Sequence, residues 1–125
     1  MANQEIRVLI VDDEVVIRDF VSEVLDDYDV LHAVNGKDAI DKIPEVLPDL
    51  IITDIKMPVM GGNEVIKFAK RYNSKIPIIV ITGYTSLDIA SECDRLGVNG
   101  FLSKPFTIVQ LREEVDRCLE ESKNE

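Results

Sequence analysis

The sequence predicts an α/β fold, a single three-layer domain in which helices cover both faces of a parallel sheet. Two patterns carry this prediction. Short runs of Val, Ile and Leu, typical of strands buried on both faces, alternate with segments whose apolar residues recur every three or four positions, as on one face of a helix. The alternation occurs five times over the 125 residues without a linker or an internal repeat. It indicates parallel strands joined by crossover helices.

Five strands are expected, and the first, third and fourth are almost entirely Val, Ile and Leu. These three should occupy the interior of the sheet, where both faces are covered. For five strands in such a fold we expect the order 2-1-3-4-5 of flavodoxin-like domains. The predicted strands are residues 6–11, 28–33, 50–54, 77–82 and 99–103.

Five helices are expected between and after these strands. The first is indicated by apolar residues at the spacing of one buried helix face, from Ile17 to Leu25. The fifth shows the same spacing from Ile108 to Leu119, and Thr107 is placed to form a capping box with Gln110 at its start. The other three are expected at about 36–46, 62–72 and 85–96.

Local signals and polarity set the expected boundaries. Pro44 should weaken the second helix, because proline lacks an amide donor. Gly97 stands where the fourth helix would end. We expect a domain over residues 6–120, preceded by an extension at 1–5 and followed by a polar tail at 121–125.

Charge and hydropathy exclude some classes of function. The net charge of −10 argues against nucleic acid as a direct partner, because a phosphate backbone requires a basic surface. No apolar run is long enough to cross a bilayer, and the polar N-terminus lacks the layout of a secretory signal. We therefore expect a cytoplasmic protein that binds no membrane.

The rare reactive side chains indicate no chemistry of their own. Cys93 and Cys118 fall at apolar positions of predicted helices, and in the cytoplasm such residues are usually small buried hydrophobes. His32, the only histidine, closes the second strand with nothing distinctive nearby, and we interpret it as structural.

Polar residues stand where four of the predicted strands end: Asp12, Asp13, Asp54, Thr82 and Lys104. The carboxyl ends of parallel strands converge on one edge of the sheet, where ligands bind in such folds. Three carboxylates so close together repel one another unless a cation lies among them, so a hard divalent ion such as Mg2+ is the first inference. A hydroxyl and an ammonium group beside that ion suit phosphoryl oxygens. The pattern therefore predicts a phosphoryl-transfer site.

The acidic turn Asp12-Asp13-Glu14 also bears on the class of ligand. A nucleotide- or flavin-binding domain of this architecture would carry Gly, Ser and Thr here, to present amide groups to a phosphate. Taken alone, the turn is equally well read as a solvated acidic cap of the first helix. Asp54 favours the interpretation as a metal site over that as a helix cap, because it places another carboxylate after a second buried strand. Held beside a cation and an ammonium group, it would stay ionised and act as a nucleophile.

Four segments form a recognisable set. They are Val8 to Glu14, Asp54 to Pro58 with Met60 and Gly62, Thr82-Gly83, and Gly100 to Phe106. In this order and spacing they resemble the receiver domain of response regulators in two-component signalling, of the chemotaxis-receiver type. The resemblance covers about residues 5–120. Each segment alone is a weak signal, whereas the complete set is very specific.

The resemblance implies a role for each site residue. Asp54 would be the phosphoacceptor, taking a phosphoryl group from a histidine of a sensor kinase or of a phosphotransfer protein. Asp13 and Asp54 would ligate Mg2+ directly, with the backbone carbonyl of Lys56 as a third ligand, and Asp12 would act through a metal-bound water. Lys104 would contact the phosphoryl group.

The resemblance also implies a switch. The Thr82 hydroxyl would move toward the phosphoryl group, and Phe101 would rotate into the space it leaves. The surface formed by the fourth helix, the fifth strand and the fifth helix would then change shape for a downstream target or an output domain. The bond between Lys104 and Pro105 would be cis.

Some positions depart from the commonest receiver pattern. Gly83 stands where Ala is frequent, and Gly61 stands where an Asp is frequent, but neither removes a chemical group that the mechanism needs. Lys56 and Tyr84 occupy positions that tune the lifetime of the phosphoryl group in this family. Because their side chains would shield the anhydride from water, we predict slow self-dephosphorylation.

Other classes remain as alternatives. We expect a signalling switch and not an enzyme. The protein would catalyse only its own phosphorylation and dephosphorylation. The chief alternative is a non-phosphorylated, receiver-like binding module. A flavin-binding electron carrier would not carry the acidic first loop, and a metal-dependent phosphatase would need an acid at Lys56 to protonate the leaving group. With no output domain after residue 122, we expect a single-domain regulator or an excised receiver.

Overall fold

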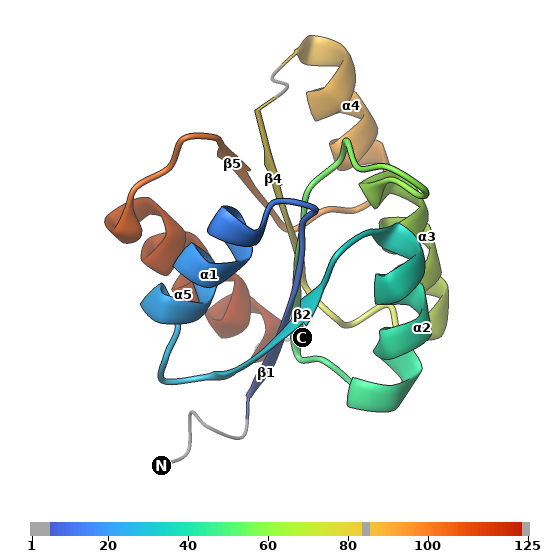
Figure 1. The fold of residues 1–125 in the computed structure, drawn as a ribbon. Coiled ribbons are helices and arrows are strands. Elements are labelled where there is room, and N and C mark those ends of the chain that lie inside the picture. Colours follow the sequence, from blue (N-terminus) through green and yellow to red (C-terminus); the bar gives the residue numbers. More distant parts are fainter. Residues whose placement is uncertain (1–5, 84–85, 124–125) are drawn as a thin grey trace.

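The computed structural model describes residues 6–83 and 86–123. Over these residues the chain forms one sheet of five parallel strands in the order β2-β1-β3-β4-β5, as predicted (Figure 1). Each strand begins within one residue of its predicted start. The strands are β1 (Arg7–Val11), β2 (Asp29–Ala33), β3 (Leu50–Thr53), β4 (Ile78–Thr82) and β5 (Gly100–Ser103).

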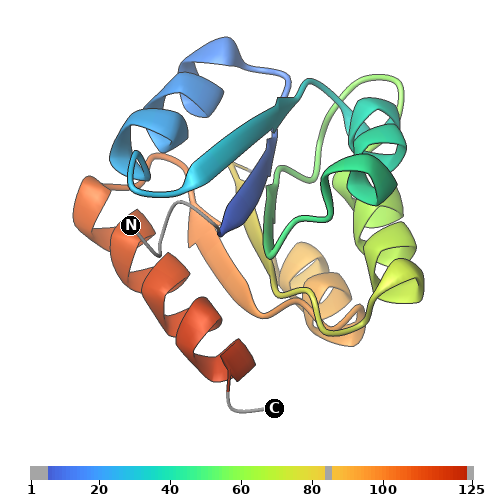
Figure 2. The same cartoon turned by 90° about the horizontal axis from the view of Figure 1, so that it is seen from below.

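Helices cover both faces of the sheet. Viewed along the sheet, α1 and α5 lie on one face, and α2, α3 and α4 lie on the other (Figure 2). The helices are α1 (Val15–Val24), α2 (Gly36–Val46), α3 (Gly62–Tyr72), α4 (Leu87–Arg95) and α5 (Ile108–Lys123). Among the described residues, no helix is long and apolar enough to span a membrane.

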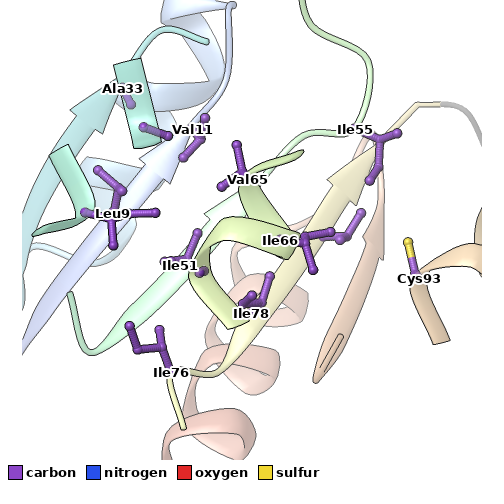
Figure 3. Packing of buried hydrophobic residues seen from close by; sticks show 14 residues of the cluster. Leu9, Val11, Ala33, Ile51, Ile55, Val65, Ile66, Ile76, Ile78 and Cys93 are labelled. Atoms are coloured by element: carbon purple, nitrogen blue, oxygen red, sulfur yellow. The ribbon is translucent and has the colours of Figure 1, made fainter. Parts of the chain in front are cut away.

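Two apolar clusters hold the layers together, one on each face of the sheet. Val21 of α1 and Leu111 of α5 pack with the side chains of alternate strand residues on one face. On the other face, Val65 and Ile66 of α3 point toward Ile51 of β3 and its neighbours (Figure 3). Burying a side chain of this size contributes about 1.5–3 kcal/mol. The central strands are therefore a rigid platform for the residues that follow them.

Helix ends follow the predicted signals. Thr107 and Gln110 form a reciprocal capping box, in which each backbone N–H donates to the other side chain, at 2.9 and 3.0 Å. Gly97 follows α4 with a φ of 81°, the left-handed conformation that favours glycine. Cys93 and Cys118 are free and buried.

The helix α2 has the predicted bounds and continues through Pro44 to Val46, because a proline in the last turn costs only one backbone hydrogen bond. One boundary differs from the expectation. The helix α5 extends to Lys123, so residues 121–123, which we expected to begin a polar tail, are helical. An ion pair of 3.1 Å between Arg117 and Glu121, one turn apart, stabilises this extension.

Candidate functional site

The predicted site residues meet at the carboxyl edge of the sheet. The register pairs Val11 of β1 with Ala33 of β2 and with Thr53 of β3, so the residues after β1 and β3 lie side by side. The backbone N–H of Asp12 donates to the Ala33 carbonyl at 3.1 Å, and that of Asp54 donates to the Val11 carbonyl at 2.9 Å. Both carboxylates thus stand on backbone that the sheet itself fixes.

Lys104 lies at the centre of the site. Its Nζ is 2.9 Å from Oδ2 of Asp12, Oδ2 of Asp54 and Oε1 of Glu14. Its side chain is only 14% exposed. Burial alone would lower the pKa of Lys104, but the neighbouring carboxylates of Glu14, Asp12 and Asp54 outweigh burial and raise that pKa above its usual range. Lys104 therefore remains an ammonium group at any physiological pH.

Asp54 presents one carboxylate oxygen to the pocket. Its Oδ1 accepts from the backbone N–H of Ile55 at 2.7 Å, while its Oδ2 faces Lys104. The residue is 5% exposed. The Thr53 hydroxyl donates to the Asp54 carbonyl at 2.9 Å and further fixes the peptide. A nucleophile needs this combination of a fixed direction and a neighbouring positive charge.

Four acids gather around this pocket. Ligand oxygens of Asp12, Asp13, Glu14 and Asp54 all lie within 4.8 Å of one another. Asp12 is fully buried, and burial raises its pKa more than the backbone N–H of Glu14 and the charge of Lys104 lower it. Oδ2 of Asp12 is paired with Lys104 by charge alone, with no hydrogen bond from any described group. Oxygen ligands at this density, one of them lacking a hydrogen-bond donor, fit a hard divalent cation.

The loop after β3 is held close beneath the site. The backbone of Gly62 lies so near the Asp54 carbonyl that a Cβ at this position would overlap it. The Gly62 N–H donates to the Ile55 carbonyl at 2.9 Å, and Gly36 donates to Met60 at 2.9 Å. Glycine therefore stands at positions 36 and 62 because neighbouring backbone leaves no room for a Cβ, and not because a turn requires a positive φ.

Thr82 and Phe101 share one face of the sheet. The register pairs Thr82 with Ser103 and Val80 with Phe101, and residues two apart in a strand project to the same side. Thr82 is fully buried, and its carbonyl accepts from the Lys104 N–H at 2.8 Å. Phe101 is partly buried against the cluster that also contains Cys93. The Thr82 hydroxyl and the Phe101 ring therefore lie on the same face of neighbouring strands, two positions apart in register.

Four other sequence interpretations have different outcomes. The peptide bond between Lys104 and Pro105 is cis, as expected. Lys56 is exposed beside the pocket, and the role of its carbonyl as a ligand stays a prediction. Tyr84 lies outside the described residues. His32 makes no approach to the acidic cluster, and its carbonyl accepts from Lys42 at 2.6 Å.

Sequence reasoning gave Glu14 no role in the site. Its carboxylate reaches Lys104 at 2.9 Å across 90 positions of the sequence. The signal was present, because Glu14 directly follows the two aspartates at the end of β1. It was obscured because an acid in the first turn of a helix is ordinary.

Fold and site together define a class: this is a phosphoryl-accepting receiver, the signalling switch of two-component phosphorelays. The chain belongs to the response regulator receiver domain family, whose model matches residues 8–116.

Curated relatives and solved structures agree with this assignment. The chain is 36% identical over 115 residues to "Sporulation initiation phosphotransferase F" of Bacillus subtilis, covering 90% of this chain and 93% of that protein. A CheY-like receiver from Methanospirillum hungatei superimposes with a TM-score of 0.90 at 29% identity, covering 95% of this chain and 97% of that one. The chemotaxis protein CheY4 of Vibrio cholerae gives a TM-score of 0.85 at 36% identity, covering 90% and 98%.

Several other relatives are much longer than this chain. The regulatory protein AtoC of Escherichia coli is 33% identical over 116 residues, which is 91% of this chain but only 25% of that protein. A protein-glutamate methylesterase/protein-glutamine glutaminase of Treponema denticola is matched over 29% of its length. In these proteins the receiver is one part of a larger chain.

Proposed function

We propose that Asp54 is the residue that accepts the phosphoryl group. The observation that carries this is the position of its Oδ2, 2.9 Å from the Lys104 ammonium group and beside three further carboxylates. Its Oδ2 attacks the phosphorus of a phosphohistidine. As the new O–P bond forms, the N–P bond breaks and the electron pair returns to the imidazole. The product is an aspartyl phosphate.

The acidic cluster is the place for Mg2+. In this proposal Asp13 and Asp54 ligate the ion directly together with the Lys56 carbonyl, and Asp12 acts through a water molecule. When bound, Mg2+ supplies positive charge to the phosphoryl oxygens. Lys104 would supply a second positive charge to the phosphoryl oxygens, and each such preorganised charge stabilises the transition state. Asp12, buried and fixed by the Glu14 N–H at 2.9 Å, keeps the metal side of the pocket in place.

The switch begins at Thr82. Phosphorylation adds about two negative charges and new acceptor oxygens, toward which the buried Thr82 hydroxyl turns. Phe101, on the same face of the sheet, rotates into the vacated space, and the surface of α4, β5 and α5 changes for its partner. The phosphoryl group biases two conformations that already exist.

Self-dephosphorylation belongs to the same proposal. Lys56, exposed beside the site, and Tyr84 limit the access of water to the aspartyl phosphate, so hydrolysis is slow. A half-life of seconds for the phosphorylated protein would contradict this part.

The partners follow from the chemistry. The donor is a sensor histidine kinase or a histidine phosphotransfer protein, and the recipient is a downstream protein or an output domain. Similarity to a sporulation phosphotransferase over 93% of its length supports a role as a relay intermediate. We place the domain at residues 6–120 and the protein in the cytoplasm, where kinase domains of this pathway class meet their receivers.

Intact-protein mass spectrometry tests the assignment. The protein is incubated with acetyl phosphate, with and without Mg2+, as wild type and as Asp54→Ala. We expect one phosphoryl group on the wild type in Mg2+ only, and none on the variant. No adduct on the wild type, from acetyl phosphate or from a histidine kinase, would favour the non-phosphorylated binding module.

A further inference from the structure

The outer edge of β5 is closed by side chains of α5. β5 is the last strand of the sheet, and the outer edge of a last strand presents unpaired backbone groups. Here the Phe101 N–H donates to Oε2 of Glu114 at 3.0 Å. The Asn99 carbonyl accepts from Nη2 of Arg117 at 2.9 Å. Two residues of one helix thus bind the backbone on both sides of Gly100.

Glu114 is itself held in place. Nη2 of Arg117 lies 2.9 Å from Oε2 of Glu114, and Nη1 of Arg117 lies 3.1 Å from Glu121. The Glu114 side chain is 21% exposed, compared with 42% for Arg117. The hydrogen bond to Glu114 is the main reason that the pKa of Arg117 is raised. The carboxylate is therefore clamped against the strand.

Gly100 makes this approach possible. A Cβ at position 100 would lie 2.6 Å from Oε2 of Glu114 and 3.0 Å from Sγ of Cys118. The first distance is shorter than real Cβ contacts and the second is tight, so a larger residue at position 100 would displace the Glu114 carboxylate from its place against the strand. The fit between strand and helix is specific at this point.

The side of β5 that faces α4 is open by comparison. A cavity of about 330 Å³ lies beside Phe101, lined by Ala90 and Cys93 of α4 and by Glu114 and Arg117 of α5. Phe101 therefore borders open space, while its backbone N–H is tied to α5. Through this bond, a movement of the strand is passed on to α5.

We propose that Glu114, held by Arg117, is a positioning residue that ties α5 to the backbone of Phe101 and carries the phosphorylation response from β5 to α5. This rests on the proposed role of Phe101 as a switch. Without the Glu114 bond, β5 and α5 respond separately. The Phe101 ring would still turn, but α5 would not follow.

The test uses the full chain labelled with 15N, as wild type, Glu114→Ala, Glu114→Gln and Glu113→Ala. The last variant is the control, because Glu113 is an exposed acid next to Glu114 on the same helix. Three quantities are measured with Mg2+ and acetyl phosphate: the phosphorylated fraction by mass, the exchange rate of the Phe101 amide, and the phosphorylation-induced shift changes in α4 and α5.

We expect Glu114→Ala to be phosphorylated normally, with an α4 response like that of the wild type. Its Phe101 amide exchanges about tenfold faster, as for the loss of one hydrogen bond, and its α5 response falls to less than about half. Glu114→Gln keeps an acceptor and most of the response, and Glu113→Ala matches the wild type. If Glu114→Ala does not fold, Arg117→Gln takes its place, because it keeps the Glu114 carboxylate but removes the guanidinium that holds it. We then expect the same changes in Phe101 amide exchange and in the α5 response, at smaller amplitude.

A full α5 response in phosphorylated Glu114→Ala would overturn the coupling and leave the proposed function intact. A wild-type protein that takes up no phosphoryl group under any donor would instead overturn the proposed function and the coupling with it. In that second case the exchange rate of the Phe101 amide would still show whether the hydrogen bond to Glu114 is present.

Discussion

The interior strands of this sheet and its edge strand β5 differ in how completely they are buried. Every residue of β3 and β4 is buried, as are the last four of β1, whereas β5 has two half-buried residues and ends in an exposed one. On the face covered by α2, α3 and α4, α3 buries four residues, whereas α4 buries only Cys93. The carboxylates of the site stand on the buried strands, and the proposed response occurs at the edge.

This difference has a physical consequence. A nucleophile and its metal ligands must keep their geometry, which dense packing enforces. A switch requires two conformations that differ by only a few kcal/mol, which partly buried elements allow. Lys104 joins the two regions, because it follows β5 but binds the carboxylates that follow β1 and β3.

Truncating one core residue in each region measures the difference directly. We expect Ile52→Ala, in the fully buried β3, to lower the free energy of unfolding by about 2–5 kcal/mol, since it leaves a cavity. Leu102→Ala, in the half-buried β5, should cost only about 1–2 kcal/mol. Urea unfolding followed by far-UV circular dichroism gives both values. Equal costs would mean that the two regions are equally well packed.

Removing the joining residue tests the link between the regions. We expect Lys104→Ala to slow phosphorylation by acetyl phosphate about 100-fold, because one preorganised charge is lost from the transition state. The fold should persist, since the loss of Lys104 leaves both apolar clusters intact. Mass spectrometry over time gives the rate, with Lys123→Ala as the control for the loss of a lysine. A rate within about threefold of wild type would remove Lys104 from the mechanism.

Metal binding should stabilise the buried region. At ten times its dissociation constant, Mg2+ should add about 1.4 kcal/mol to the free energy of unfolding, which raises Tm by about 4–7 °C. Asp13→Asn should abolish this shift while leaving the metal-free Tm nearly unchanged, because Asp13 is exposed. Asp19→Asn, an exposed acid of α1, is the control. A shift that survives in Asp13→Asn would place the ion elsewhere.

The smallest expected difference is in the alkylation rates of the two cysteines. Burial raises the pKa of Cys118 to about 11 and also raises the pKa of Cys93, so both are unreactive thiols at neutral pH. Cys93, 4% exposed on the sparsely buried α4, should be alkylated faster than Cys118, which is 1% exposed on α5. Peptide mapping after iodoacetamide treatment distinguishes them, and in urea their rates should converge. Faster labelling of Cys118 in the folded protein would contradict the division.

Much of this arrangement could be predicted from the sequence. Buried parallel strands have an unmistakable composition, and their carboxyl ends must converge, so Asp12, Asp54, Thr82 and Lys104 were placed correctly without coordinates. The expected capping box and the cis bond before Pro105 are both present. The capping box depends on local pattern and the convergence of the strand ends on a rule of topology, whereas the cis bond was expected from the resemblance to receiver domains.

Contacts between distant side chains could not be predicted in the same way. The bond from Lys104 to Glu14 depends on where two side chains meet in space, as does the bond from Phe101 to Glu114. The extension of α5 through Glu121 depends on an ion pair that polarity alone does not distinguish from a solvated tail. In each case a charged residue that looks ordinary in sequence gains a specific partner only in the fold.

Hydrogen exchange of the full chain in Mg2+, with and without acetyl phosphate, tests the central claim most directly. On phosphorylation we expect peptides from α4, β5 and α5 to change their exchange rates, while those from β1 and β3 stay the same. Asp54→Ala should show no change in either region. A response that is spread evenly over the sheet, or confined to β1 and β3, would contradict the separation of a rigid site from a responsive edge.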